Sequence, residues 1–353
     1  MIEEKENPTS RGQARRDWPC YTVAIRTLGT AGEKFIAEID SLHRLDPAPV
    51  SINVYIPHGY RIPEVPYDDV KFFRCEKGMV AQRALRFDEI ETEWILFLDD
   101  DVVVPADGVA RLFRVAKEMS ADCVSVDHEV AGGYVNILKN IVVSGWWPHR
   151  DTSTAFKVGL NGEYTYTRYP VREGMQTECV CFQNFLVKKS AHLAIRYDEE
   201  RWFDRFGYTI HDELTYAKKL IGNGYRIVSY FADDFCHLDA KCGHAKVSSG
   251  TESKKMSCRF VSWHRNVFNT KVGGLWSVVA FASFMARQYF LRGVRCSIHG
   301  QPSFFWRALA DIWKAWRFMR HEPYCLLKPV DEARSSSNME LKAPRTSHHE
   351  RHP

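Results

Sequence analysis

The sequence predicts an α/β fold in which a mostly parallel central sheet is flanked by helices and followed by a C-terminal helical extension. Of the 353 residues, 45% are hydrophobic and 26% are charged, a composition that allows a large buried core. Between residues 19 and 270, short apolar runs alternate with amphipathic helical patterns, as they do when parallel strands are joined by helices. Two further helical patterns follow this region.

Residues 19–130 carry the alternation most clearly. Buried strands are predicted where a short apolar run lies between turn residues, at 21–28, 51–57, 70–75, 94–99 and 123–130. Helices are predicted where apolar residues recur three and four positions apart, at 32–45, 78–90 and 105–119.

The rest of the folded region divides into two parts. Residues 131–270 complete one domain with 19–130, and the stretch 148–178 has the short alternating runs of small strands and turns. Residues 271–330 carry two helical patterns, at 272–291 and 304–320.

Charge and cysteine content indicate which partners and which cellular compartment to expect for the protein. The 48 Lys and Arg residues against 44 Asp and Glu residues give a net charge of +4, too small to predict a nucleic-acid partner. The ten cysteines include no C-x2-C pair, and residues 1–18 lack the apolar core of a secretory signal. Residues 1–18 and 331–353 are polar and are predicted to be disordered. We therefore expect a cytoplasmic protein with reduced thiols, and no uninterrupted apolar run is long enough to span a bilayer.

Three consecutive carboxylates follow the most apolar predicted strand. Asp99, Asp100 and Asp101 lie where WILFLD ends, and a parallel sheet binds ligands at the carboxyl ends of its strands. Alternation along a strand predicts that Asp99 and Asp101 converge on one ligand. Carboxylate oxygens suit Mg²⁺ or Mn²⁺, which also takes oxygens from substrate phosphates. The structural alternative is a solvated turn.

Two longer blocks place this triplet in a family context. The first is EKGMVAQRALRFDEIETEWILFLDDDVVVP, and the second is CFQNFLVKKSAHLAIRYDEERWFDRFGYTIHDELTYAKKLIGNGYRIVSY. Over about residues 20–270 the chain resembles the inverting family 2 glycosyltransferases of the GT-A fold. The first block resembles the end of their nucleotide-sugar half (19–130 here), in which an apolar strand ends in a D-x-D motif. The second resembles their acceptor half (131–270 here), in which an acidic motif opens a helix.

The resemblance implies roles for the triplet and for residues near it. Asp101 is implied to bind a divalent metal, Mn²⁺ or Mg²⁺, that holds the nucleotide diphosphate, and Asp99 to support the ribose or the metal. Asp100 is grouped with the donor-binding residues. Arg83 is implied to contact the nucleotide or its diphosphate, or else it is a surface cation of a helix. The end of the first strand offers two further donor-binding candidates, Arg26 and Thr27.

The second block and the residues after it supply the remaining candidates. The resemblance implies that Asp212 deprotonates the acceptor hydroxyl, with Glu213 as the second choice. The structural alternative for Asp212 is a helix N-cap or a partner of the helix dipole. His237 is implied to complete the metal shell, or it is structural. Arg265 is implied to contact a phosphate, or it holds the start of a helix.

Taken together, the resemblance implies a metal-dependent inverting glycosyltransferase. Such an enzyme moves a sugar from a nucleotide-diphosphate sugar, with a UDP-sugar favoured, to a hydroxyl of a glycan or a lipid-linked glycan. One alternative is a nucleotidyltransferase of similar fold, which would normally carry a Gly-rich, Arg-containing loop after its first strand. The other is a non-catalytic sugar-nucleotide or glycan-binding protein, which would bind the donor without turnover.

The helical pattern at 304–320 is amphipathic. Its apolar face carries Trp306, Leu309, Ala310, Trp313 and Trp316. Trp-rich basic helices of this kind often lie in the headgroup plane of a bilayer. Residues 272–320 therefore either make a peripheral contact with the cytoplasmic face of a membrane, which suits a lipid-linked acceptor, or pack on the catalytic domain.

Overall fold

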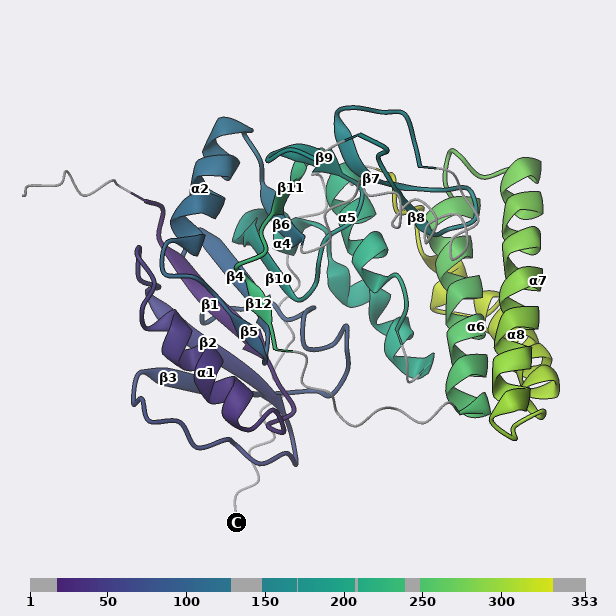
Figure 1. Cartoon of the computed structure of the whole chain (residues 1–353), viewed down its shortest axis with the longest axis horizontal. Coiled ribbons are helices and arrows are strands. Elements are labelled where there is room, and N and C mark those ends of the chain that lie inside the picture. The colour runs from purple at the N-terminus through teal and green to yellow at the C-terminus, as the bar shows by residue number, and fades with distance from the viewer. Residues whose placement is uncertain (1–17, 128–147, 170, 207–208, 239–247, 333–353) are drawn as a thin grey trace, which may run out of the picture.

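The computed structural model describes residues 18–127, 148–169, 171–206, 209–238 and 248–332, and it contains one large sheet with helices on both faces (Figure 1). Its strands are β1 (Tyr21–Arg26), β2 (Ser51–Pro57), β3 (Val70–Cys75), β4 (Trp94–Asp99), β6 (Cys123–Asp127), β7 (Thr154–Val158), β8 (Tyr164–Tyr166), β9 (Met175–Thr177), β10 (Asn184–Lys188) and β11 (Ile227–Phe231). Two short strands, β5 (Val102–Val103) and β12 (Cys236–His237), form a separate antiparallel pair.

The ten strands lie in the order β3-β2-β1-β4-β10-β6-β11-β9-β7-β8. Seven of these strands run in one direction, namely β3, β2, β1, β4, β6, β11 and β8. The other three, β10, β9 and β7, run in the opposite direction. Strands from both halves of the chain therefore build a single sheet. The predicted α/β class, with a mostly parallel central sheet, flanking helices and a helical C-terminal part, is confirmed.

Apolar residues of β4 alternate between the two faces of the sheet, as a buried strand requires. Trp94, Leu96 and Leu98 pack with α1 (Glu33–Leu42) and α2 (Gly108–Glu118) on one face. Ile95 and Phe97 pack on the other face with α4 (Lys189–Ala194), α5 (Asp212–Gly222) and the 3-10 helix η1 (Tyr197–Phe206). Both faces of β4 are buried, and the strand ends at Asp99. Packing on the two faces therefore holds Asp99 at the edge of the sheet.

The helix predicted over residues 78–90 is wrong. Only single-turn hydrogen bonds form there, such as the one from the amide of Ala84 to the carbonyl of Val80 (2.7 Å). At Phe87 the backbone turns into the left-handed region, with φ of 51°. Phe87 is buried between Tyr55, Phe97 and His192. Tertiary packing of this one ring therefore interrupts a pattern that has helical spacing.

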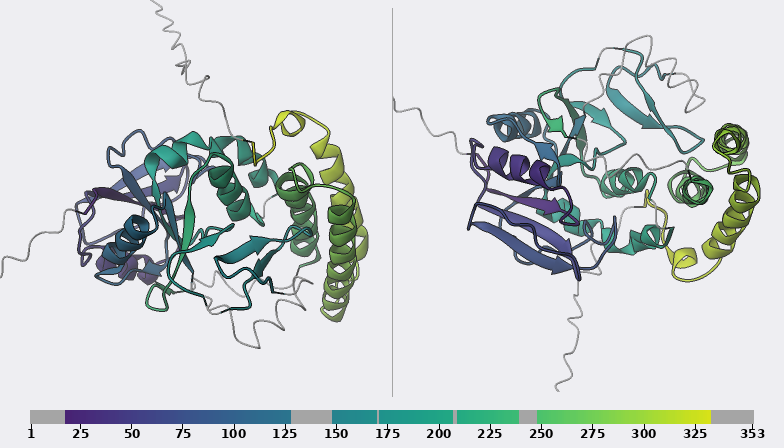
Figure 2. Two further views of the ribbon diagram at one scale, coloured as in Figure 1. Left: turned by 90° about the horizontal axis from the view of Figure 1, so that it is seen from above. Right: turned by 60° about the horizontal axis from the view of Figure 1, so that its bottom comes forward.

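The C-terminal part consists of α6 (Ser249–Trp263), the π-helical turn η2 (His264–Phe268), α7 (Leu275–Ile298), α8 (Phe304–Met319) and the 3-10 turn η3 (Tyr324–Leu326). Figure 2 shows α7 and α8 together at the end of the molecule away from β1, β2 and β3. None of the helices in the described segments combines the length and the hydropathy that a membrane-spanning helix needs. The disorder predicted for 1–18 and 331–353 falls outside the described residues except at three positions: Trp18 stacks on Phe113, Asp331 accepts a hydrogen bond from the amide of Lys271, and Glu332 ends the described chain.

Candidate functional site

An ion pair joins the ends of two neighbouring strands. Arg26, the last residue of β1, is the register partner of Asp99, the last residue of β4. Its guanidinium donates from Nε to Asp99 Oδ1 (2.5 Å) and from Nη2 to Asp99 Oδ2 (2.9 Å). This two-bonded geometry is the strong form of an arginine–carboxylate pair, and it lies at the edge of the sheet where ligands of parallel strands bind.

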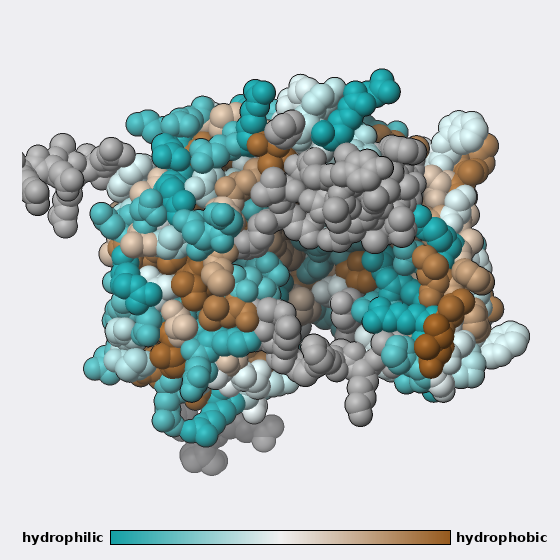
Figure 3. Space-filling model, viewed as in Figure 1, coloured by the Kyte–Doolittle hydropathy of each residue, from teal (hydrophilic) through white to brown (hydrophobic). Residues whose placement is uncertain are grey.

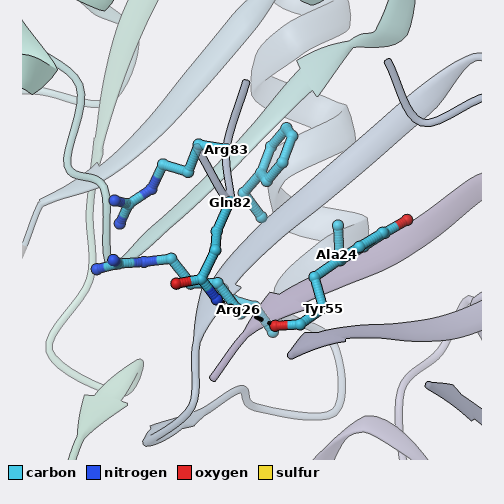
Figure 4. Close-up of a pocket in the computed structure, with 7 residues that line it drawn as sticks. Ala24, Arg26, Tyr55, Gln82 and Arg83 are labelled. Carbon is cyan, nitrogen blue, oxygen red and sulfur yellow. Dashed lines mark hydrogen bonds between the residues drawn. The ribbon is translucent and has the colours of Figure 1, made fainter. Parts of the chain in front are cut away.

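Arg83 is the second arginine on the same carboxylate. It donates from Nη2 to Asp99 Oδ1 (3.0 Å) and to the carbonyl of Phe182 (2.9 Å), and only 3% of its surface is exposed. The alternative of a surface cation is therefore wrong. Figure 4 shows the guanidinium groups of Arg26 and Arg83 side by side and pointing the same way, with Gln82 and Tyr55 behind them.

A carboxylate from the other half of the chain holds the turn that carries Arg83. Asp204, on η1, accepts hydrogen bonds from the amides of Val80 and Ala81, each at 3.0 Å. Gly78 permits this approach, because a Cβ there would clash with Asp204. Sequence reasoning missed this contact, since Asp204 is more than 120 residues away.

The charges at this edge stabilise one another. Burial acts to raise the pKa of Asp99, but Arg26 and Arg83 outweigh it and hold that pKa below the ordinary value. Burial and the neighbouring Arg26 lower the pKa of Arg83. Both oxygens of Asp99 accept from arginine, so Asp99 does not offer a free oxygen to a metal in this arrangement.

Asp100 turns toward the loop that follows β1. The hydroxyl of Thr27 donates to Asp100 Oδ2 (2.5 Å) and accepts from the amide of Gly29 (2.7 Å). Gly29 has φ of 72°, and a side chain there would clash with the carbonyl oxygen of Arg61. Burial raises the pKa of Asp100, and the neighbouring carboxylates Asp101 and Asp99 add to this. Thr27 thus positions Asp100 and closes the turn.

Asp101 has a different partner again. β12 pairs with β5 so that His237 is opposite Val102, and the amide of Leu238 donates to the carbonyl of Asp101 (2.8 Å). The imidazole Nε2 of His237 lies 3.0 Å from Asp101 Oδ1. The strand ends at Asp99, so strand alternation does not itself place Asp101, and the convergence of Asp99 and Asp101 on one ligand stays a prediction. His237, the partner of Asp101, also lowers the pKa of Asp99.

A buried carboxylate that sequence reasoning missed lies near the triplet. Glu38, on α1, is fully buried, and neither of its oxygens makes a hydrogen bond of ordinary geometry. Burial raises its pKa well above the ordinary value, and Asp100, Asp101 and Asp99 raise it further, while the amide of Val102 opposes the rise. The only sequence signal was one acidic residue on the apolar face of a predicted helix.

The residues around Asp101 fit a divalent metal as part of a larger shell. Among the described residues, no group of three or more His, Cys, Asp or Glu side chains is arranged to hold an ion by itself. Asp101 and His237 nevertheless place a carboxylate beside an imidazole, and Mg²⁺ in phosphate-binding sites takes one or two protein ligands plus water and substrate oxygens. The raised pKa of Glu38 favours its neutral form, and a cation bound nearby would lower that pKa.

Asp212 and Glu213 are neighbouring buried carboxyl groups in the first turn of α5. Burial, followed by the charge of Asp212 and a hydrogen bond to it, raises the pKa of Glu213 well above the ordinary value. Asp212 is 4% exposed, and its Oδ2 makes no hydrogen bond to any described residue. His211 is the N-cap position, and no side chain caps the helix, so the N-cap alternative for Asp212 is wrong. The charge of Asp212 contributes to the raised pKa of Arg26 and opposes the lowering of the pKa of Arg83.

A second network fixes the residue before Asp212. His211 adopts the left-handed conformation (φ 64°), and its Nε2 lies 3.4 Å from Glu163. Arg259 donates to the other oxygen of Glu163 (2.9 Å). Although burial acts to raise it, the pKa of Glu163 is lowered to about 2, because His211 and Arg259 favour the carboxylate. Sequence reasoning did not identify Glu163 or Arg259.

Arg265 has a structural role and does not join this site. Its guanidinium donates to both oxygens of Glu200 (3.1 and 2.7 Å) and to the carbonyl of Lys328 (2.5 Å), and it is 1% exposed. Lys219 reaches the same carboxylate at 2.9 Å. The expected phosphate contact is therefore corrected: Arg265 ties η1 to the segment after α8.

Comparisons with known proteins give structural similarity only. No protein-family model matches the chain, and no curated protein matches its sequence. The chain is similar to the crystal structure of S. aureus TarS residues 1–349, with 15% identity and a TM-score of 0.44 over 84% of this chain and 80% of that one. For the same protein in complex with UDP-GlcNAc the identity is 12% and the TM-score is 0.45, over 84% of this chain and 81% of that one. For GalNAc-T7 with UDP, GalNAc and Mn²⁺ the identity is 11% and the TM-score is 0.41, over 81% of this chain and 59% of that one.

Proposed function

We propose that this protein is a metal-dependent inverting glycosyltransferase. It moves a sugar from a nucleotide-diphosphate sugar, with a UDP-sugar the favoured donor, to a hydroxyl group of a glycan or lipid-linked glycan. The proposal rests mainly on one observation: Arg26 and Arg83 both bind Asp99 of the carboxylate triplet at the edge of the sheet, and the charge of Asp212 favours both guanidinium groups from the other half of the chain. A base for a hydroxyl and cations for a diphosphate therefore come together from two distant parts of the chain.

Arg26 and Arg83 bind the diphosphate of the donor. Two guanidinium groups share the carboxylate of Asp99, so two cations lie together at a position where a phosphate oxygen can be bound. The cavity behind them, lined by Ala24, Tyr55 and Gln82 among others, has a volume of only about 10 Å³, which is room for one water. The diphosphate consequently binds on the outer side, where Arg26 is 18% exposed.

Asp101 and His237 would hold the Mn²⁺ or Mg²⁺. Bound there, the cation would offset the negative charge that develops on the departing nucleoside diphosphate. Thr27 keeps Asp100 turned toward the loop after β1, so Asp101 is the member of the triplet that faces His237.

Asp212 is the general base. Its Oδ2, which is without a hydrogen bond to the described residues, takes the proton of the acceptor hydroxyl. The hydroxyl oxygen forms a bond to the anomeric carbon while the bond from that carbon to the diphosphate oxygen breaks. This single displacement inverts the anomeric configuration. Glu213 remains protonated beside Asp212 and donates a hydrogen bond to it.

Donor turnover tests this proposal. Purified full-length protein is incubated with UDP-, GDP- and dTDP-sugars, with Mn²⁺ or with EDTA, and the released nucleotide is measured. We expect release of one nucleoside diphosphate that requires metal and is lost in Asp101→Ala. Once an acceptor is found, the product should have inverted configuration, and retention would contradict the mechanism. Pyrophosphate release from nucleoside triphosphates would favour a nucleotidyltransferase. Donor binding without turnover, unchanged in Asp212→Asn, would favour a binding protein.

A further inference from the structure

α7 and α8 present a large apolar surface to solvent. We call it the outer face, and it consists of Trp276, Val279, Phe290, Val294 and Ile298 of α7 and Trp306, Leu309, Trp313 and Trp316 of α8. Trp276 is 76% exposed, and Ile298 and Trp306 are each 78% exposed. Figure 3 shows apolar side chains in brown and tan along the edge of the molecule where α7 lies. Monomeric soluble proteins seldom expose a contiguous apolar patch of this kind without a use for it.

α7 is apolar on two sides. Its buried residues are Ser277, Phe281, Phe284, Gln288, Gly293 and Cys296. A second stripe carries the outer-face residues of α7. A surface helix of a globular protein normally presents charged residues on the side away from the core. The buried stripe satisfies packing within this chain, so the second stripe is left for another apolar partner.

α8 shows the same separation with a different composition. It packs through Phe304, Ala308, Ala315 and Met319, so the Trp-rich face predicted from the sequence is the one that points outward. Arg317 lies over the ring of Trp313 (4.9 Å), and Arg320 lies over the ring of Trp316 (3.7 Å). An indole ring with a guanidinium beside it suits the boundary between acyl chains and headgroups, because the ring is buried while the cation reaches phosphate.

Charge is distributed as an anionic partner requires. The whole chain has 48 Lys and Arg residues and 44 Asp and Glu residues. Residues 271–320 contain eight of the basic residues and one of the acidic residues, so the rest of the chain has 40 basic and 43 acidic residues. The net positive charge of the protein is therefore concentrated on this part. The one acid, Asp311, lies 3.2 Å from the ammonium group of Lys314 and also accepts a hydrogen bond from Ser253, so it offsets Lys314 and leaves Arg317 and Arg320 as outward cations.

A groove opens beside the outer face. It has a volume of about 380 Å³ and lies between α6, η2, α7 and α8, with Phe260, Trp263, Val278, Trp316 and Arg320 among its lining. Its lining is mainly aromatic and aliphatic, and one arginine belongs to it. This combination suits an acyl chain whose phosphate group meets Arg320.

We propose that the outer face binds an anionic lipid membrane, with α7 and α8 lying in the plane of the interface. The helix α7 has 24 residues and is about 36 Å long at 1.5 Å per residue. Its outer stripe enters the acyl boundary, and the basic residues of α8 contact lipid phosphates. A second copy of this chain is a poor occupant, because a two-fold contact would bring two basic faces together without acidic partners. The inference does not depend on the proposed transfer reaction.

Vesicle binding tests the electrostatic part. Full-length protein is sedimented with vesicles of phosphatidylcholine alone or with phosphatidylglycerol added. We expect binding only when the anionic lipid is present, weakening as salt is raised. The triple variant Lys314→Gln/Arg317→Gln/Arg320→Gln should lose on the order of 100-fold in partition onto the anionic vesicles. The matched control Arg86→Gln/Lys117→Gln/Arg196→Gln removes the same charge from exposed positions elsewhere and should stay within a few-fold of wild type.

A second variant tests the apolar part. Trp276→Ser/Trp306→Ser/Trp313→Ser removes only exposed rings, so its circular dichroism and thermal midpoint should match those of wild type. We expect its binding to anionic vesicles to fall by 10-fold or more, because buried apolar area drives interfacial insertion. Equal losses in the charge variant and its matched control, or no binding by wild type, would overturn the proposal. A wild-type dimer in light scattering that dissociates in the Trp variant, without vesicle binding, would assign the outer face to self-association.

Discussion

Arg26 and Asp99 are register partners on adjacent parallel strands and are joined by two hydrogen bonds at the strand ends, 2.5 and 2.9 Å long. The sheet itself therefore sets their separation. Burial acts to lower the pKa of Arg26, but Asp99 and then Asp212 raise it. This residue consequently feels charges from both halves of the chain, and it links the donor side of the site to the acceptor side.

Removing the charge of Arg26 tests its role in donor binding. We expect Arg26→Gln to weaken nucleoside diphosphate binding by about 10- to 100-fold, since a charged hydrogen bond is worth roughly 1.5–3 kcal/mol. Isothermal titration calorimetry with metal present measures this. Arg61→Gln is the matched control, because Arg61 is largely exposed and pairs only with Glu64 nearby. Equal affinity in Arg26→Gln and wild type would remove Arg26 from the site.

Asp101 and His237 are expected to act together on the metal. Asp101→Asn should lower donor turnover by about 100-fold or more, since charge stabilisation by a cation is worth several kcal/mol. His237→Ala should weaken Mn²⁺ binding, measured by the paramagnetic resonance of the free ion. His43→Ala is a suitable control, because His43 pairs with Asp69 on the edge of α1. Unchanged Mn²⁺ binding in both site variants would contradict the metal assignment.

The two carboxyl groups that open α5 should differ in their effect on turnover. Asp212→Asn should lower turnover by about 10²- to 10⁴-fold with donor affinity retained, because it removes the base alone. Glu213→Gln keeps a hydrogen-bond donor beside Asp212 and should have a much smaller effect. Rates and donor affinities measured for both variants separate the roles. The reverse order of severity would move the base to Glu213.

Arg265 is expected to contribute to stability. Arg265→Met leaves Glu200 with Lys219 as its remaining cation in a fully buried site, and breaking a buried pair costs about 3–5 kcal/mol. Urea unfolding followed by circular dichroism measures the loss. A double variant, Arg265→Met/Glu200→Gln, should recover part of it because no carboxylate is left underpaired. A loss below about 1 kcal/mol in the single variant would contradict this role.

Acid should destabilise the fold through Glu200 and Glu163. Burial acts to raise the pKa of both, but Lys219 and Arg265 lower that of Glu200 to about 2, and His211 and Arg259 lower that of Glu163 to about 2, from 4.5. The unfolded chain therefore takes up protons first. The stabilisation is complete above about pH 4.5 and is lost as the pH falls toward 2. Urea midpoints across this window should decrease, and the decrease should be shallower in Glu163→Gln.

Local patterns predicted the first strands well, because β1, β2 and β4 are buried along almost their whole length and are made mostly of apolar residues. The bounds of β2, β3 and β4 agree with the prediction. The helix predicted over 78–90 is wrong. The spacing of apolar residues there is helical, but it does not reveal that the ring of Phe87 packs against Tyr55 and Phe97. The alternation rule does not reach Asp101, because the rule applies only while the strand continues and β4 ends at Asp99.

By itself, the sequence determined that three carboxylates follow a buried strand, that Asp212 opens a helix, and that a Trp-rich basic helix lies near the end of the chain. These are local properties of composition and spacing. Only the tertiary structure decided that Asp99 pairs with Arg26 and Arg83. It likewise decided that Asp101 pairs with His237, and that Arg265 is buried in an ion pair with Glu200. It also decided which face of α8 is buried. Such pairings depend on strand order and on contacts between residues far apart in the chain, which no local pattern encodes.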